Sequence, residues 1–390
     1  MIENCRKSLD KGGSYGALLT DLSKAFDCLP HDLLLAKLYA YGFDMNSVTL
    51  LHSYLTTRKQ RVKIDHVYSS WEEILFGVPQ GSILGPLLFN IFVCDLFEFI
   101  DEEVNIASYA DDNTPYITAE RTEEIIRSLE NTSLEMLSWF SSNGMKANPD
   151  KCHFLLNGTE SYKAKIGGHT IESSKQQKLL GVIIDNKLTF EKHIDNLCDR
   201  ASQKLNALCR VSSYMSTEQK RMIMKAFINS QFGYCPLVWM NHSRKLNQRI
   251  NKIHERALRV VYNDKHASFE ELLSKDKSTT VHVRNLQVLV TEMFKVKLGI
   301  SPVIMKDIFQ LRKCNYRTRN FDEFVSHCVK TVYYGTETVS FLGPKLWTLL
   351  PQEFKDIDNL PEFKSRIKSW VPHNCPCRLC KTYIHQLGFI

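Results

Sequence analysis

The feature that most constrains the fold of this chain is a pair of adjacent carboxylates, Asp111 and Asp112, within the segment SYADDNTPY. An apolar stretch from Val104 precedes the pair and a turn-like Asn-Thr-Pro follows it. We therefore expect a strand, a tight turn and a second strand over residues 104–118, with the pair at the turn. Neighbouring carboxylates repel each other unless water or a cation surrounds them. The pair indicates either an acidic hairpin tip or half of a metal site.

A further carboxylate, Asp21, closes the apolar run GALLTD, which predicts a buried strand over residues 16–21. If this strand and the hairpin lie side by side in one sheet, three carboxylates converge. A few hard oxygen ligands suit Mg²⁺, which keeps some of its waters and accepts substrate phosphates. Two such ions about 3.5–4 Å apart can support phosphoryl transfer. The three carboxylates therefore favour a nucleotidyl transferase.

The pattern of apolar residues predicts alternating strands and helices up to about residue 188. A basic, almost wholly helical region follows over residues 190–273, and a mixed region follows that. The predicted helices of the first region span residues 30–41, 46–56, 82–100 and 120–143, and its predicted strands span residues 60–74 (a strand pair), 152–157, 163–171 and 178–185.

Composition narrows the class of protein. The 390 residues are 43% hydrophobic and carry a net charge of +7, which fits a globular chain able to bind nucleic acid. The start of the chain has no apolar signal-peptide core, and the most apolar stretch contains Asn90, Asp95 and Glu98, so we expect a core helix and no membrane span. Most of the twelve cysteines lie singly in apolar patterns, as reduced thiols do. We expect an intracellular protein of the cytoplasm or nucleus; the pattern leaves its oligomeric state open.

Five segments, in order, resemble the palm motifs of reverse transcriptases, and are most similar to those of non-LTR (LINE-type, jockey-like) retrotransposons. The segments are LLTDLSKAFDCLPH (18–31), GVPQGSILGPLLFN (77–90), SYADD (108–112), GMKANPDKCHFL (144–155) and KLLGVIID (178–185). The resemblance implies an α+β fold, in which a right-hand polymerase palm (an antiparallel sheet with packed helices) precedes an α-helical thumb and a mixed C-terminal region. We place the palm with partial fingers at residues 1–188, the thumb-like domain at 189–275, the mixed region at 276–370 and a Cys/His tail at 371–390.

The resemblance also assigns roles around the metals. Asp21 and Asp111 would bridge the two ions, and Asp112 would be the accessory carboxylate near the primer end. Leu22 would offer its backbone carbonyl to the nucleotide-bound ion. Lys151 matches the lysine proposed as general acid to the leaving pyrophosphate.

Other matched residues would form the nucleotide pocket. Phe26 matches the steric gate, a ring under the sugar that leaves no room for the 2′-hydroxyl. Gln80 and Gly81 would line the pocket of nucleotide and template, and Tyr109 would lie near the primer terminus. For Asp27, one position beyond the gate, we expect a structural or local hydrogen-bonding role.

The implied function is an RNA-directed DNA polymerase module that adds dNTPs to the 3′-hydroxyl of a DNA primer on an RNA template. Mg²⁺ would be its metal, with Mn²⁺ as a substitute. Because the chain begins just before the first catalytic strand, we expect it to lack the endonuclease and most of the fingers. The alternative is a catalytically silent nucleic-acid-binding remnant. The C-terminal tail argues against an intron- or telomere-type reverse transcriptase. The aromatic residue Phe26 at the gate position argues against a viral RNA-dependent RNA polymerase.

Two further regions suggest binding. The basic helices between residues 192 and 259 would contact phosphates of the duplex, and Arg58, Lys59 and Arg61 form a second basic cluster near the template path. Near the C-terminus three cysteines and a histidine have ligand types that suit Zn²⁺; a loose, reduced tail is the alternative. These four residues are Cys375, Cys377, Cys380 and His385.

Overall fold

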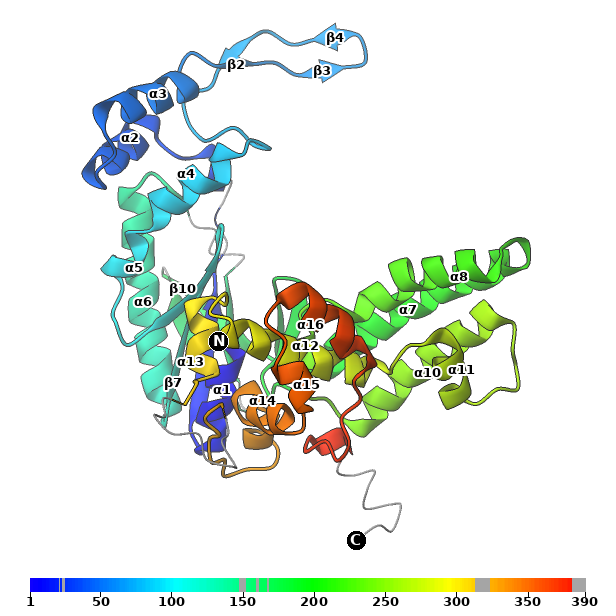
Figure 1. Ribbon diagram of the computed structural model, residues 1–390. Coiled ribbons are helices and arrows are strands. Elements are labelled where there is room, and N and C mark those ends of the chain that lie inside the picture. Colours follow the sequence, from blue (N-terminus) through cyan, green and yellow to red (C-terminus); the bar gives the residue numbers. More distant parts are fainter. Residues whose placement is uncertain are drawn as a thin grey trace. The chain divides into compact units, whose positions relative to one another are not determined.

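The computed structural model describes residues 1–390 except 21, 23–24, 147–151, 159–160, 167, 313–322 and 381–390. The chain divides into two compact units (Figure 1). The first unit comprises Met1 and Gly13–Gln177, and the second comprises Ile2–Gly12 and Lys178–Ile390. Among the helices so described, none combines the length and the apolar character that crossing a membrane requires.

The first unit is organised around a six-stranded sheet. In spatial order its strands are β6 (Asn105–Tyr109), β7 (Asp112–Ala119), β1 (Ser14–Leu19), β8 (His153–Leu156), β10 (His169–Ser174) and β9 (Lys163–Ile166). Neighbouring strands are antiparallel, except that β8 and β10 are parallel. The strand that leads to Asp21 therefore lies directly beside the second strand of the predicted hairpin. The short hairpin of β11 (Gln176–Leu179) and β12 (Val182–Asp185) follows.

Helix α6 (Thr122–Ser142) packs along this sheet (Figure 1). Its buried residues Ile125, Leu129, Met136 and Phe140 recur at helical spacing and form one apolar face. The helix meets β1 at Gly16, where a Cβ atom would lie 2.4 Å from Cγ2 of Ile125. A glycine in this strand thus lets the helix approach the sheet closely.

The remaining helices of the first unit share the same apolar core. The predicted helix over residues 82–100 is broken in two, at Cys94 and Asp95. The break has a polar cause: the buried Nζ of Lys37 donates to the carbonyl of Phe92 at 2.9 Å and to Oδ1 of Asp95 at 2.8 Å. These helices are α2 (His31–Ala40), α3 (Met45–Leu55), α4 (Leu84–Val93) and α5 (Leu96–Phe99), with the 3₁₀ turn η1 at Ala25–Asp27.

The predicted strand pair over residues 60–74 forms an exposed, two-part hairpin that we call the arm (residues 59–73). Strands β2 (Lys59–Gln60) and β5 (Glu72–Glu73) pair at its base, and β3 (Lys63–Ile64) and β4 (Val67–Tyr68) pair at its tip (Figure 1). Arg61 lies over two aromatic rings, 4.0 Å from the centroid of Tyr68 and 4.5 Å from that of Trp71. These contacts give the narrow ribbon some packing of its own.

The second unit is built of helices. Its described residues contain α7 (Glu191–Val211), α8 (Thr217–Ile223), the π-helical turn η4 (Met224–Ile228), α9 (Pro236–Trp239), α10 (Arg244–Tyr262), α11 (Phe269–Asp276), α12 (Val281–Lys297), α13 (Val303–Ile308), α14 (Val339–Thr348), α15 (Gln352–Lys355) and α16 (Leu360–Arg366). Serines begin several of them: Ser216 and Ser268 form complete capping boxes. The later helices share a core around α12 that includes Phe294, Trp347 and Phe363.

The first helix of the chain, α1 (Ile2–Asp10), belongs to this second unit. The buried Arg6 donates to the carbonyl of Glu337 at 2.8 Å. Asp10 accepts from the backbone N–H groups of Lys330 and Thr331, at 3.0 and 2.6 Å, and these bonds help to lower the pKa of its carboxyl against the opposing effect of burial. Glu3 accepts the N–H groups at the start of α14. The predicted α+β class, with an antiparallel-rich sheet before a helical region, is confirmed; the four predicted domain boundaries stay predictions.

Candidate active site

The carboxylate pair lies at the tip of the β6–β7 hairpin, as the sequence predicts. Tyr109 pairs with Asp112, so the turn consists of Ala110 and Asp111. Ala110 has a φ of +54°, in the left-handed region that primed hairpin turns use and that L side chains rarely adopt. Asp111 and Asp112 are half-buried, and Tyr109 is 67% exposed.

The interpretation of Asn113-Thr114-Pro115 as a turn is wrong, because all three residues lie within β7. Asn113 and Thr114 are buried at 0% and 1% exposure. Turn-forming residue types misled the prediction, since the side chain of Asn113 bonds back to Ser108 and to the carbonyl of Asp111 instead of forming a turn after the carboxylate pair.

Asn113 is a residue that sequence reasoning missed. Its backbone carbonyl accepts from the N–H of Thr20 at 3.2 Å and from the Thr20 hydroxyl at 2.8 Å. Its side-chain Oδ1 accepts from the Ser108 hydroxyl at 2.8 Å, and its Nδ2 donates to the carbonyl of Asp111 at 3.4 Å. Asn113 thus ties the hairpin tip to the end of the neighbouring strand. Its signal in the sequence was its position directly after the carboxylate pair.

These contacts also locate the end of the first strand. Thr20, which immediately precedes Asp21, forms a β-bridge with Asn113, which immediately follows Asp112. Asp21 itself lies outside the described residues, as does Lys151. Leu22 is buried at 4% exposure in the core of the first unit.

The loop that carries Phe26 is fastened to the loop that carries Gln80. The N–H groups of Gly77 and Val78 donate to the carbonyls of Leu29 and Phe26, at 2.8 and 2.9 Å. Gly77 has a φ of +84°, and a Cβ there would lie 2.7 Å from the Phe26 carbonyl oxygen, so only glycine fits this crossing. The Phe26 ring stacks on Phe89 with centroids 4.4 Å apart, which fixes its orientation.

A cleft of about 830 Å³ opens beside this junction. Asp27 and Gln80 line it, and Gln80 Nε2 donates to Asp27 Oδ1 at 2.8 Å, so Asp27 does make a hydrogen bond, but to a residue 53 positions away. Arg58 and Lys59, at the base of the arm, supply basic lining. Within the described residues the lining includes none of Phe26, Asp111 and Asp112. Gly81, next to Gln80, is exposed and has a φ of +79°.

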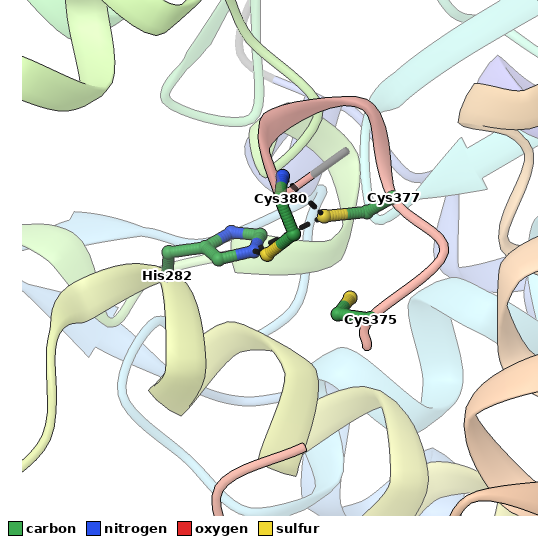
Figure 2. Close-up of side chains that lie close together, drawn as sticks. All are labelled: His282, Cys375, Cys377 and Cys380. Carbon is green, nitrogen blue, oxygen red and sulfur yellow. Dashed lines mark hydrogen bonds between the residues drawn. The ribbon is translucent and has the colours of Figure 1, made fainter. Parts of the chain in front are cut away.

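The second unit gathers the three cysteines of the predicted tail cluster around a histidine that the sequence did not indicate. The ligand atoms of Cys375, Cys377, Cys380 and His282 all lie within 4.8 Å of one another (Figure 2). His385, the histidine predicted from the sequence, lies outside the described residues.

Some basic side chains of the helices between residues 192 and 259 form ion pairs within the second unit. Arg249 pairs with Asp195 and Asp199, and Arg221 pairs with Asp276 at 2.6 Å. Asp276 is buried, and hydrogen bonds from its partners outweigh that burial and lower the pKa of its carboxyl. Other basic side chains of this region face solvent: Lys192, Arg200, Lys204, Arg210, Lys225, Lys245, Lys252 and Arg256.

Comparisons with known proteins agree with the motifs. Residues 2–184 match the family described as reverse transcriptase (RNA-dependent DNA polymerase). The chain is 29% identical over 260 residues to the probable RNA-directed DNA polymerase from transposon BS of Drosophila melanogaster, covering 63% of this chain and 28% of that protein. It is 32% identical over 197 residues to the RNA-directed DNA polymerase from mobile element jockey of Drosophila melanogaster, covering 48% of this chain and 21% of that protein.

Among solved structures, apo telomerase from Candida tropicalis matches with a TM-score of 0.43 at 15% identity, over 70% of this chain and 46% of that one. The chain spans less than a third of the length of the two curated relatives. The resemblance found in the sequence is confirmed for the matched segment. Residues 2–184 are therefore similar to the reverse transcriptase family, and the chain is similar to the polymerases of jockey-like non-LTR retrotransposons.

Proposed function

We propose that this chain is the polymerase module of a retrotransposon reverse transcriptase, which extends a DNA primer with dNTPs on an RNA template. One observation carries the proposal: the β-bridge between Thr20 and Asn113. It places the residue before Asp21 against the residue after Asp112, and so supports the convergence of Asp21 with the hairpin carboxylates. The matched family and its mobile-element relatives support the same reaction.

The donor set at the hairpin tip fits Mg²⁺. Asp111 and Asp112 offer hard carboxylate oxygens, and both are half-buried and therefore still reachable by water and by phosphate. Bound there, two ions would supply the activation of the primer hydroxyl and the stabilisation of the leaving oxygen. The chain's own task is to hold the carboxylates in register, which the bonds of Asn113 to Ser108 and Asp111 support. Mn²⁺, which binds similar oxygen ligands, is the expected substitute.

For nucleotide selection we propose that the Phe26 ring excludes a ribose. A gate must be rigid, and the stack on Phe89 supplies that rigidity. Gln80 and Gly81 closely follow Val78, whose N–H donates to the Phe26 carbonyl. The exposed Tyr109 lies beside the carboxylates. Lys151 remains the proposed proton donor to pyrophosphate.

The template–primer duplex requires contacts to phosphates that ignore sequence. The exposed basic side chains of α7 and α10, among them Lys204 and Arg256, are suited to this, and those at the base of the arm add to it. The described cysteines form no disulfide bonds, which supports work in a reducing compartment, the cytoplasm or nucleus.

Primer extension on an RNA template with dNTPs and Mg²⁺ tests the proposal. Asp111→Asn should lower extension roughly 10³-fold or more, because a metal-bridging carboxylate contributes several kcal/mol to the transition state. Asp65→Asn is a matched control, since Asp65 also occupies a hairpin turn, at the tip of the arm. Equal loss in both variants would contradict the assignment.

The same preparation tests the alternative function. A wild-type chain that extends no primer under Mg²⁺ or Mn²⁺, yet binds RNA with an affinity that falls steeply with salt, would be a silent nucleic-acid-binding remnant. Phe26→Val should raise incorporation of ribonucleotides relative to deoxyribonucleotides if the ring is the gate. An unchanged ratio, in a variant that still extends primers, would remove Phe26 from that role.

A further inference from the structure

We propose that His282, Cys375, Cys377 and Cys380 bind one zinc ion, and that this ion fastens the C-terminal segment to helix α12. Figure 2 shows the imidazole of His282 directed at the thiols of Cys377 and Cys380, with Cys375 on the remaining side. The proposal concerns the second unit only and does not depend on polymerase activity.

The spacing of the ligand atoms fits a tetrahedral ion. Zinc bonds of about 2.3 Å to sulfur and about 2.0 Å to nitrogen place neighbouring ligand atoms roughly 3.5–3.8 Å apart. His282 Nε2 lies 3.3 Å from Cys377 Sγ and 3.4 Å from Cys380 Sγ, and all four ligand atoms lie within 4.8 Å of one another. A small contraction or expansion of the cluster would therefore reach the coordination geometry.

The chemistry of the donors selects zinc over the hard cations. Thiolates and imidazole are soft or borderline ligands, and a tetrahedral set of sulfur and nitrogen is typical of zinc. Cys375 and Cys377 are each 3% exposed, and His282 is 6% exposed. Four protein ligands leave no open position for water or substrate, so the ion has a structural role.

The turn between two of the ligands is already arranged for a metal. The N–H of Cys380 donates to Cys377 Sγ at 3.4 Å, a contact that would stabilise negative charge on a coordinating sulfur. Arg378, inside the same turn, pairs with Glu337 at 2.9 Å. These contacts hold the Cys377–Cys380 turn against the body of the unit.

His282 has the orientation that a ligand needs. It lies at the start of α12, which Thr280 caps by accepting from the N–H of Val283 at 3.2 Å. Its Nε2 faces the thiols, whereas its buried Nδ1 has no hydrogen-bond partner. The ring therefore makes its described polar contacts only on the side of the cluster.

The ion would close a segment that already lies on α12. Gln287, five residues after His282 on the same helix, donates from Nε2 to the carbonyls of Lys368 and Trp370 at 3.2 and 2.8 Å. Trp370 and the cysteines Cys375 and Cys377 belong to the same apolar core. Zinc would add the last attachment of this segment, after which residues 281–297 and 360–380 move as one piece.

Metal content of the purified full chain tests the proposal. Wild type grown with zinc and purified under reducing conditions should hold about one zinc per chain. His282→Ala should lose it, whereas His385→Ala and the exposed His373→Ala should retain it. Loss in His385→Ala with retention in His282→Ala would overturn the assignment, and so would a zinc-free wild type that takes up no zinc when it is added.

A second measurement separates metal loss from misfolding. His282→Cys supplies a fourth thiolate and should bind zinc, and replacement by cobalt should give the visible absorption of tetrahedral thiolate-bound Co²⁺ in wild type. Chelation should lower the thermal midpoint of wild type and of His282→Cys, and should leave that of His282→Ala unchanged. A wild-type midpoint indifferent to the chelator, or cobalt spectra without thiolate bands, would overturn the proposal.

Discussion

The carboxylate hairpin of the first unit and the Cys/His cluster of the second unit gather candidate metal ligands in opposite ways. Asp111 and Asp112 are neighbours in the sequence, half-buried, and hard oxygen donors. The cluster joins residues 98 positions apart, such as His282 and Cys380, and is nearly closed to solvent. An open carboxylate site suits an ion that works on a substrate, and a closed thiolate–imidazole site suits an ion that holds the fold. Burial thus distinguishes the site proposed for a substrate-bound ion from the site proposed for a structural ion.

The largest expected effect on stability is a loss of free energy of unfolding at acid pH, because the second unit buries neutral histidines. Burial, with a smaller contribution from Arg284, lowers the pKa of His254 to about 3, while Asp276 opposes the shift. Burial, with Arg200, lowers the pKa of His193 to about 4. The unfolded chain takes up these protons first, near pH 6.5. Stability is therefore complete above pH 6.5 and falls, by a few kcal/mol at about 1.4 kcal/mol per pKa unit, as the pH drops toward 4.

Denaturant unfolding between pH 7 and pH 4 checks this prediction. His254→Leu should reduce the loss of stability on acidification, since neither ring nitrogen of His254 has a hydrogen-bond partner to lose. The exposed His266→Gln is the control and should leave the pH dependence unchanged. An identical pH dependence in wild type and His254→Leu would show that this burial does not set the acid limit.

A smaller effect is expected at the hairpin, where Asn113 is the buried polar residue. Asn113→Leu keeps the backbone bridge to Thr20 but removes the side-chain bonds to Ser108 and Asp111. We expect a loss of about 1–3 kcal/mol in the free energy of unfolding, together with a lower rate of primer extension. Ser108→Ala removes one partner at an exposed position and should cost less. Equal costs would contradict the view that the buried amide organises the tip.

The smallest effect is expected at Ala110, whose φ of +54° strains an L side chain. Ala110→Asn should stabilise the first unit by up to about 1 kcal/mol, because asparagine tolerates the left-handed region. Ala110→Val should destabilise it. Thermal midpoints of the three proteins give the order, and any other order would show that the turn does not hold this conformation in solution.

The elements that depend on residues close together in the sequence could be predicted from the sequence. The strand before Asp21, the helix from His31 and the hairpin around Asp111 follow from apolar spacing and turn residues, and the structure contains them. Prediction failed where a contact spans many positions. The break after Val93 depends on Lys37, 58 positions before its partner Asp95, which no helical pattern records.

The candidate site divides along the same line. Asp111, Asp112 and Gln80 were proposed from short motifs, because the residues at a hairpin or a tight loop are close together in the sequence. Asn113 was misread because its burial comes from the neighbouring strand. His282 was missed because it precedes Cys377 by 95 positions, so no spacing rule joins it to the cysteines of the tail.

The place of α1 has a consequence for the order in which the chain folds during synthesis. Glu3, Arg6 and Asp10 find their partners at residues 330–340, at least 320 positions later. At roughly 5–20 residues per second, a ribosome needs about 15–60 s to deliver those partners. The strands and helices from residue 13 to 177 emerge within that interval. Helix α1 is thus made before these strands and helices but docks after them, and until then its ionic side chains remain in water.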